Sequence, residues 1–454
     1  MRLIKLIGVL LLKAVPSCDT PTKCFSSSIY RTYHTTSTRS DTHIRNKIGS
    51  MEKPPPISDR LKKAKEEAIW GMHIADALAM PVHWYYNADD IKWGYGGWLT
   101  GYQPPNKKHP TSILTISNFG GSGRAYGQKS QQVIGNVILH DKLPFWTSRD
   151  RNVHYHQGMS AGDNTLNTLM ALQMLQTIIR VDKQAIKPDS LVREAVLEDY
   201  VKFMTTPGTH HDTYCESFHR SFFKDWMTES KPPKKGADIV KFAETRLKNY
   251  QNRSEDSQLL AIGALVLTIP WIIRTAHQTE TECANSTVDL IKLTHPTPSL
   301  YPFVDLYARL LHGVLNGKDL RAGVLEASGH SVLGGPQTRE ELLSLIDEAG
   351  RHPKGSEKRL RAYQNALSDL GMACYIEGAM TSMLFLAYEF SNDFEGGVLA
   401  NANCGGENCH RGGALGALLG AASVRNGAYI PQKWKDGLGV AKSRVETAVR
   451  DMNR

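Results

Sequence analysis

The side chains of Glu407, Cys409 and His410 stand close together in the segment NCGGENCHRGG and could do nucleophilic or acid–base chemistry. Two glycines precede them and a run of Gly, Ala and Leu follows, which predicts a turn leading into a closely packed helix. Backbone N–H groups at a helix N-terminus are unpaired and partly positive, so this position favours bound anions and lowers the pKa of a cysteine. The alternative is that Glu407 or Asn408 only caps a core helix.

Other reactive side chains lie at three distant points of the chain. Asp163 and Asn164 precede a helical stretch, where an acid or amide is also an ordinary helix cap. His156 lies shortly before them and His83 lies far upstream, and histidines titrate near neutrality. The segment HHDTYCESFHR at 210–220 gathers possible metal ligands, but its spacing matches no zinc pattern, so we expect no dedicated metal site there.

The elements that must position these residues are helices. Apolar and small residues recur three and four positions apart through most of the chain after residue 56, which predicts an all-α fold, with α+β as the second reading. Residues 84–158 lack this period and are rich in Gly, Trp, Tyr, Pro and His, so we expect irregular but ordered structure. The expected helices cover 58–79, 164–180, 190–204, 237–250, 257–268, 300–316, 339–349, 357–366, 376–391 and 409–423.

The N-terminal region differs in composition from the rest. Residues 1–50 hold eight Lys or Arg and two Asp, so most of the net charge of +9 lies there. The apolar start and the Ser-, Thr- and Arg-rich continuation predict a targeting leader over 1–55, mitochondrial rather than plastid, with a disordered arm as the alternative. A start at Met51 would give a cytoplasmic form.

The composition of the remaining chain bounds the kinds of partner. It shows no basic stripe with interleaved aromatics and no apolar run long enough to span a bilayer, so we expect no nucleic-acid partner and no membrane span. The five cysteines beyond the leader show no paired spacing, which argues against a disulfide framework. A small-molecule substrate is the expected partner, and the oligomeric state has no sequence signal.

Four stretches of the chain resemble the ADP-ribosylglycohydrolase family in order and approximate spacing. They are ADALAMPVH, GDNT, LTHP and NANCGGENCHRGGALGALLGAASVRNGAYIPQKW, and the last is the most specific. The resemblance covers about 58–440 and implies one domain over 56–445, a compact multi-helix bundle with a central cleft, in which 84–158 is an enlarged insertion. It also implies hydrolysis of a glycosidic bond of ADP-ribose, assisted by two Mg²⁺ ions.

The chain departs from the family at the positions of the metal ligands. Two adjacent Mg²⁺ ions need several carboxylates, and only Asp163 and Glu407 supply them, so we expect the two-magnesium centre to be absent and no cofactor to be required. Asp163, Asn164 and Glu407 are the ligands if magnesium binds. A single softer ion such as Zn²⁺, held by His83, Cys409 and His410, is the other possibility. The residues at the matching positions are His83, Asp163, Asn164, Glu407, Cys409 and His410.

In place of the metals, these side chains suggest metal-independent catalysis. The Cys409 thiolate is the expected nucleophile, a histidine moves the proton and a carboxylate orients it. Because adjacent helix residues do not face each other, His83 or His156 suits this role better than His410. The expected catalytic residues are Cys409, His410, Glu407, Asp163 and His83. The residues expected to bind substrate are Asn164, His156, Trp84, Tyr85 and Asn408.

The sequence therefore predicts a hydrolase, or a related enzyme, acting on a glycosidic or other small-molecule substrate. A metal-dependent ADP-ribosyl glycohydrolase and a non-catalytic protein that binds ADP-ribose or a nucleotide are the alternatives. A structural protein, as in the crystallin branch of the family, is a third. Replacement of reactive residues by other reactive residues, rather than by Ala or Gly, favours an enzyme.

Overall fold

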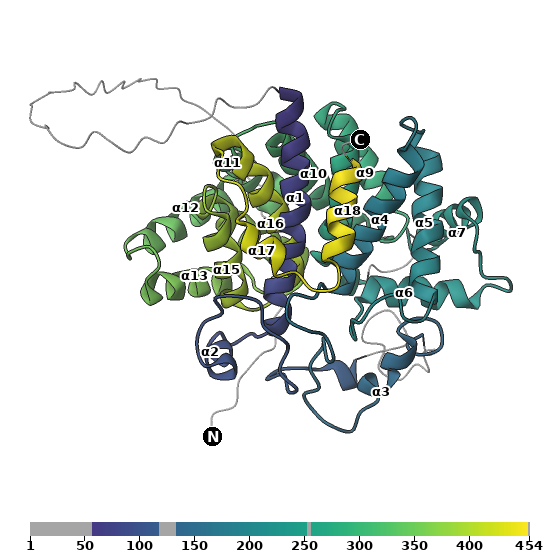
Figure 1. Cartoon of the computed structure of the whole chain (residues 1–454), viewed down its shortest axis with the longest axis horizontal. Coiled ribbons are helices and arrows are strands. Elements are labelled where there is room, and N and C mark those ends of the chain that lie inside the picture. Colours follow the sequence, from purple (N-terminus) through teal and green to yellow (C-terminus); the bar gives the residue numbers. More distant parts are fainter. Residues whose placement is uncertain (1–56, 118–132, 252–255, 453–454) are drawn as a thin grey trace, which may run out of the picture. The chain divides into compact units, whose positions relative to one another are not determined.

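The structure is a computed structural model that describes residues 57–117, 133–251 and 256–452. The targeting leader predicted for 1–55 lies outside these residues. The described parts contain eighteen α-helices and isolated β-bridges but no β-strand, which confirms the all-α prediction (Figure 1). Within the described residues, none of the helices is both long and apolar enough to cross a lipid bilayer.

Nine of the expected helices form close to their expected limits. They are α1 (Ile57–Ala79), α4 (Leu166–Asp182), α5 (Asp189–Thr205), α7 (Gly236–Gln251), α10 (Tyr301–Leu315), α12 (Pro336–Gly350), α13 (Glu357–Leu370), α14 (Ile376–Glu389) and α16 (Asn408–Ser423). The tenth expectation, 257–268, is displaced: α8 (Gly263–Thr275) begins later and continues through Pro270. It begins later because Ile262 N–H donates to the Cys374 carbonyl oxygen, at a bridge that interrupts the periodic stretch.

Periodicity did not reveal the other helices. They are α2 (Asp89–Tyr95), α3 (Leu143–Trp146), α6 (Ser217–Thr228), α9 (Glu280–Ile291), α11 (Leu320–Ser328), α15 (Phe394–Cys404), α17 (Gln432–Asp436) and α18 (Lys442–Met452). In α9 the interior is rich in Thr, Ser and Asn, which are weak helix formers. Its signal is the capping box at its start, where Thr279 and Glu282 satisfy each other's backbone N–H groups.

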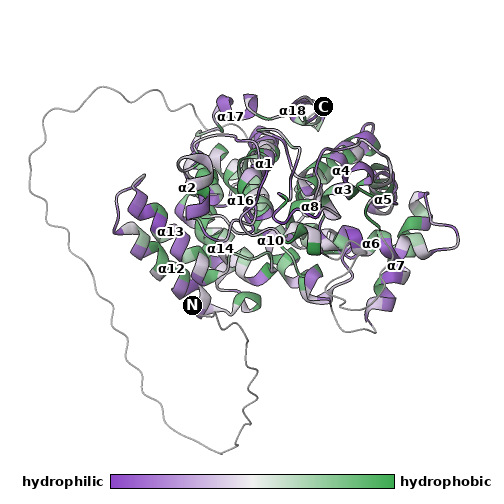
Figure 2. Ribbon diagram, turned by 90° about the horizontal axis from the view of Figure 1, so that it is seen from below, coloured by the Kyte–Doolittle hydropathy of each residue, from purple (hydrophilic) through white to green (hydrophobic). Residues whose placement is uncertain are grey.

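The centre of the fold is α16, every residue of which is buried. α1 packs along it with close backbone contact. A Cβ atom on Gly71 would lie 2.0 Å from the Gly416 carbonyl oxygen, and one on Gly420 would lie 2.2 Å from the Glu67 carbonyl oxygen. The small residues that follow the reactive segment therefore allow α1 and α16 to approach each other, with α8, α10, α14 and α15 packed around them. Figure 2 shows hydrophilic residues instead along α12 and α13.

The described residues of 84–158 form an irregular but ordered segment, as expected from their aromatic content. Two short helices, α2 and α3, are its only α-helices, and turns make up most of the rest. Trp146 is fully buried and its indole N–H donates to the Thr213 carbonyl oxygen at 2.8 Å. The His109 N–H donates to the Asn152 carbonyl oxygen at 2.8 Å. The first contact holds the segment beside the residues that lead into α6, and the second joins two parts of the segment to each other.

Candidate active site

A backbone exchange holds the segment after α1 against the turn before α16. The Trp84 N–H donates to the Gly406 carbonyl oxygen at 2.7 Å, and the Gly406 N–H donates to the Tyr85 carbonyl oxygen at 2.8 Å. Gly405 has a φ of +66°, and a Cβ there would lie 2.1 Å from the Tyr85 carbonyl oxygen. Only glycine tolerates both the left-handed φ and this close approach. The exchange fixes His83 beside the N-terminus of α16.

Four side chains from distant parts of the sequence then form one line of contacts. Asp212 Oδ1 lies 2.7 Å from His156 Nδ1, and His156 Nε2 lies 2.7 Å from His83 Nδ1. His83 Nε2 lies 2.8 Å from Glu407 Oε1. All four side chains are buried. Burial lowers the pKa of His83 to about 4, so the ring is neutral at neutral pH.

Glu407 also begins a second group of contacts, with His410 and Glu216. Glu407 is the N-cap of α16, and its Oε1 accepts a hydrogen bond from the His410 backbone N–H at 3.3 Å. His410 Nδ1 lies 3.0 Å from Glu407 Oε1 and 3.5 Å from Glu216 Oε1. Glu216 is the N-terminal flanking residue of α6, and its Oε2 accepts a hydrogen bond from the Asn167 amide. One imidazole therefore stands between two buried carboxyl groups.

The two carboxyl groups beside His410 have pKa values displaced in opposite directions. Burial alone would raise the pKa of Glu407, but the neighbouring His83 and His410 hold it well below its usual range. Burial raises the pKa of Glu216. Burial opposes the charged form of His410 too, but Glu216 and Glu407 raise its pKa to about 10. The site thus contains an ionised Glu407 and a His410 imidazolium. The carboxyl group of Glu216 holds a proton more readily than that of Glu407.

One oxygen of this site is free for further contacts. Glu407 Oε2 is buried and has no hydrogen-bond partner among the described residues. A buried acceptor without a partner is unfavourable by about 1–3 kcal/mol unless a water molecule or ligand satisfies it. Glu407 is therefore held by its Oε1 and offers its Oε2 to whatever enters the site.

The prediction of a lowered pKa for Cys409 is wrong. Burial raises the pKa of the thiol well above its usual range, and the negative charges of Asp76 and Glu407 act in the same direction. The side chain is fully buried, and its Sγ lies 3.9 Å from the Asp76 carbonyl oxygen. The cysteine lies at a helix N-terminus as expected, but desolvation outweighs the field of the helix.

Asp163 and Asn164 make structural contacts. Asp163 Oδ2 accepts from the Ser160 backbone N–H at 2.8 Å and Oδ1 accepts from the Val440 backbone N–H at 3.2 Å, so this carboxylate ties two loops together. The Asn164 amide donates to Asp76 Oδ2 at 2.9 Å. Neither residue contacts the line of side chains from Asp212 to Glu407 through the hydrogen bonds or ion pairs found among the described residues.

The other residues predicted to bind substrate have separate surroundings. The Trp84 ring stacks on His83 with ring centroids 3.7 Å apart, and its φ of 63° lies in the left-handed region, which is strained for a tryptophan. Tyr85 is buried edge-on against His109. The Asn408 amide donates to the Ala402 carbonyl oxygen at 3.1 Å, a contact that supports the turn. Of these three residues, Trp84 is the one that stacks on His83.

Sequence reasoning missed two acids of the site, Asp212 and Glu216. Both lie in the segment 210–220, whose cluster of His, Asp, Cys and Glu suggests metal binding rather than acid–base chemistry. Asp212 Oδ2 also accepts from the Leu166 backbone N–H at 2.7 Å, so it joins the start of α4 to His156. The sequence signal that could have indicated these two acids is the accumulation of acids and histidines in a segment without helical period. The histidines that contact Asp212 and Glu216 lie elsewhere in the sequence.

Comparison with known proteins identifies the family of this chain. A family model described as ADP-ribosylglycohydrolase matches residues 57–453. The chain belongs to the ADP-ribosylglycohydrolase family. A solved structure titled "ADP-ribosylglycohydrolase-related protein complex" matches 87% of this chain and 99% of its own, with 14% sequence identity and a TM-score of 0.44. A search of curated proteins found no match. Membership of this family supports a hydrolytic function.

The side chains present in this member of the ADP-ribosylglycohydrolase family do not fit two magnesium ions. Mg²⁺ requires near-octahedral oxygen ligands. Asp163 is engaged with two backbone N–H groups, and Glu407 is the one carboxylate of the expected set that lies in the site. The His410 imidazolium stands beside Glu407 and already balances the negative charge of that carboxylate. The donor set thus differs in both charge and chemistry from a two-magnesium centre.

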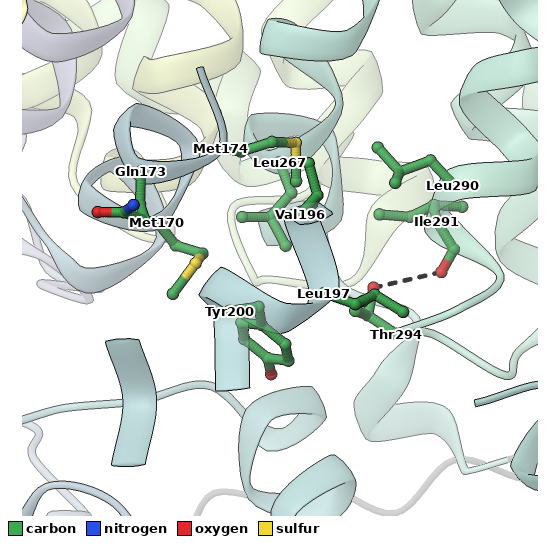
Figure 3. Close-up of a pocket in the computed structure, with 10 residues that line it drawn as sticks. All are labelled: Met170, Gln173, Met174, Val196, Leu197, Tyr200, Leu267, Leu290, Ile291 and Thr294. Atoms are coloured by element: carbon green, nitrogen blue, oxygen red, sulfur yellow. Dashed lines mark hydrogen bonds between the residues drawn. The ribbon is translucent and has the colours of Figure 1, made fainter. Parts of the chain in front are cut away.

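A separate apolar pocket lies among α4, α5, α8 and α9 (Figure 3). Aliphatic and methionine side chains form most of its lining, and the Tyr200 ring stands at one end with its hydroxyl group turned away from them. That hydroxyl lies 2.9 Å from His219 Nδ1, and His219 Nε2 lies 3.2 Å from Asn167 Oδ1. Since Asn167 also contacts Glu216, hydrogen bonds connect one wall of this pocket to the active site.

Proposed function

We propose that this protein hydrolyses a glycosidic bond in a small molecule of the ADP-ribose type, with Glu407 and Glu216 as its paired carboxyl groups. Family membership supports the reaction class. The observation that carries the proposal is the geometry around His410, where two buried carboxyl groups approach one imidazole nitrogen and Glu407 Oε2 is left free.

Glycoside hydrolysis needs one carboxyl group that donates a proton and one carboxylate that accepts a proton or stabilises positive charge. Environments that push two pKa values apart assign these roles. Glu216, whose pKa is raised by burial, is the proton donor, and Glu407, whose pKa is held low by His83 and His410, is the carboxylate. His410 keeps the two groups in place and carries the balancing positive charge.

The reaction step balances with these groups alone. A water molecule at Glu407 Oε2 attacks the anomeric carbon and gives its proton to that carboxylate. The glycosidic carbon–heteroatom bond breaks at the same carbon, and the leaving group takes the proton of Glu216. Exchange with solvent then removes the proton from Glu407 and returns one to Glu216, which restores the site.

Substrate entry requires movement of the residues that cover the site. Glu407 is fully buried, and His410 and Glu216 are buried as well. Trp84 covers the neighbouring His83 with a strained backbone, so displacement of this residue would relieve strain as it opens the site. A closed site also excludes bulk water, which strengthens the interactions of charged groups inside it.

The nucleophilic role of Cys409 stays a prediction. A thiol whose pKa is raised is protonated at neutral pH and is a poor nucleophile. The carboxyl pair requires no such thiolate.

The test is hydrolysis of a panel of N- and O-glycosides of ADP-ribose, with release of ADP-ribose followed by chromatography. We expect turnover by the wild type and a loss of about 100-fold or more in kcat for both Glu407→Gln and Glu216→Gln, because each removes an acid–base group. Glu377→Gln is the matched control, because Glu377 is an exposed glutamate in the first turn of α14.

Full activity of either site variant would overturn the assignment of its carboxyl group. Binding of ADP-ribose by the wild type without turnover of any glycoside in the panel would instead identify a binding protein. Turnover that requires added Mg²⁺ and stops with a chelator would identify the metal-dependent family reaction.

A further inference from the structure

His83, His156 and Cys409 form a second cluster beside the carboxyl pair. The His83 and His156 rings are almost parallel, with an interplanar angle of 7°, and His83 Nδ1 faces His156 Nε2 at 2.7 Å. One ring nitrogen of each histidine and Cys409 Sγ lie within 4.8 Å of one another. All three side chains are buried, and they come from three separate parts of the chain.

Each histidine contacts a carboxylate through the ring nitrogen that faces away from the other histidine. His83 Nε2 contacts Glu407 Oε1 at 2.8 Å, and His156 Nδ1 contacts Asp212 Oδ1 at 2.7 Å. A carboxylate on the distal nitrogen fixes the tautomer of a metal-binding histidine and turns the lone pair of the other nitrogen toward the metal. Both histidines show this arrangement, and their two remaining nitrogens point at each other.

A proton count shows that the arrangement lacks one positive charge. The three contacts from Asp212 to Glu407 need three protons, but two neutral imidazoles supply two. If both carboxylates accept N–H bonds, two lone pairs face each other at 2.7 Å without a proton between them. An additional proton or a metal ion between the two rings would remove this conflict.

We propose that His83 Nδ1, His156 Nε2 and Cys409 Sγ bind one soft divalent metal ion of the zinc type. Two nitrogens and one sulfur are donors that select Zn²⁺ or Co²⁺ over Mg²⁺. Zinc–nitrogen bonds of about 2.0–2.1 Å place two tetrahedral ligand nitrogens about 3.3 Å apart. The two nitrogens, now 2.7 Å apart, must therefore separate by about 0.6 Å, and the rings must turn so that both lone pairs converge on the ion. Among the described residues, the Cys409 thiol makes one hydrogen bond, at 3.9 Å to the Asp76 carbonyl oxygen, so transfer of its sulfur to a metal ion breaks only this weak contact.

The charges balance when the metal binds. The Cys409 thiol releases its proton to solvent and forms the sulfur–metal bond, which leaves one net positive charge on the metal and its three ligands. Glu407 and Asp212 stand on the far sides of the two histidines and face that charge. Three protein ligands leave a fourth tetrahedral position for a water molecule. This inference does not depend on the proposed hydrolysis.

The test uses the full chain without an affinity tag, stripped by a chelator and titrated with Zn²⁺ in a calorimeter and with Co²⁺ in an absorption spectrometer. We expect one tightly bound ion per chain and, with Co²⁺, a thiolate-to-metal charge-transfer band. Cys409→Ser should abolish the band and weaken binding by at least about 10-fold. Cys404→Ser is the matched control, because Cys404 is equally buried but lies outside the cluster, and it should change neither.

Asp212→Asn keeps all three ligands and tests the support of His156. It should retain the band and weaken binding by about 10- to 100-fold, as expected for a group that orients a metal ligand. Circular dichroism establishes whether each variant is folded. If Cys409→Ser does not fold, the metal affinity of Asp212→Asn tests the proposed site instead. Absence of stoichiometric binding to the wild type would overturn the proposal and leave a shared proton between the histidines. An unchanged band in folded Cys409→Ser would overturn it as well.

Discussion

Replacing Gly416 with alanine tests the packing of α1 on α16. The new Cβ would lie 2.1 Å from the Gly71 carbonyl oxygen and 2.7 Å from the Ala75 Cβ. An ordinary carbon contact is about 3.5 Å, so the two helices must move apart by about 1 Å or more, and a backbone oxygen cannot rotate away. Overpacking of this kind costs about 1–3 kcal/mol, and more when backbone must move. Since alanine regains about 1 kcal/mol of helix propensity, we expect a net loss of about 2 kcal/mol.

Urea unfolding followed by circular dichroism measures this change as a shift in midpoint at constant slope. Gly350→Ala is the control, because Gly350 is exposed at the end of α12 and an added Cβ meets nothing within 4 Å. That variant should be as stable as the wild type or slightly more stable. A Gly416→Ala protein that is no less stable than the wild type would refute the close approach of the two helices.

Three further predictions concern buried ionisable groups. Lys435→Met should lower the free energy of unfolding, measured in urea, by about 1–3 kcal/mol, because the fully buried Glu67 carboxylate loses its contact at 2.7 Å and keeps only Lys63 Nζ, at 3.1 Å, as an ion-pair partner; adding Glu67→Leu should restore most of the loss. Burial lowers the pKa of His295 to about 3, so the stabilisation that its neutral ring gives is complete above about pH 6.5 and falls by about 1.4 kcal/mol per pH unit below it; His295→Gln should reduce the dependence of the urea midpoint on pH between about 7 and 5, and other buried histidines such as His83 should keep the rest of it. Iodoacetamide should alkylate Cys409 only after unfolding, as read by mass spectrometry, and rapid labelling of the native protein would contradict the raised pKa of this thiol.

The helical fold could be predicted because its signal is local. Apolar residues at helical spacing located α1, α4 and α10, and the run of small residues marked α16 as a helix packed on several sides. Periodicity failed where polar residues fill a helix, as in α9, and where backbone pairing interrupts a periodic stretch, as before α8.

The candidate site could be predicted only in part, because its contacts join distant residues. Sequence reasoning found His83, His156 and Glu407 as reactive residues, but the order of their contacts with Asp212 depends on the three-dimensional fold. The pKa of Cys409 could not be predicted from its place at a helix N-terminus. Its direction depends on complete burial, which a pattern of neighbours along the sequence does not reveal.

The proposed hydrolysis requires Glu216 as the proton donor and Glu407 as the carboxylate that remains ionised. The most direct measurement compares kcat of wild type and Glu216→Gln on two glycosides of ADP-ribose, one with a poor leaving group and one with a nitrophenol. A nitrophenolate leaves without a proton, so loss of the donor matters little for that substrate. We predict a loss of about 100-fold or more on the first substrate and a much smaller loss on the second. Equal losses on both substrates would contradict the role of Glu216.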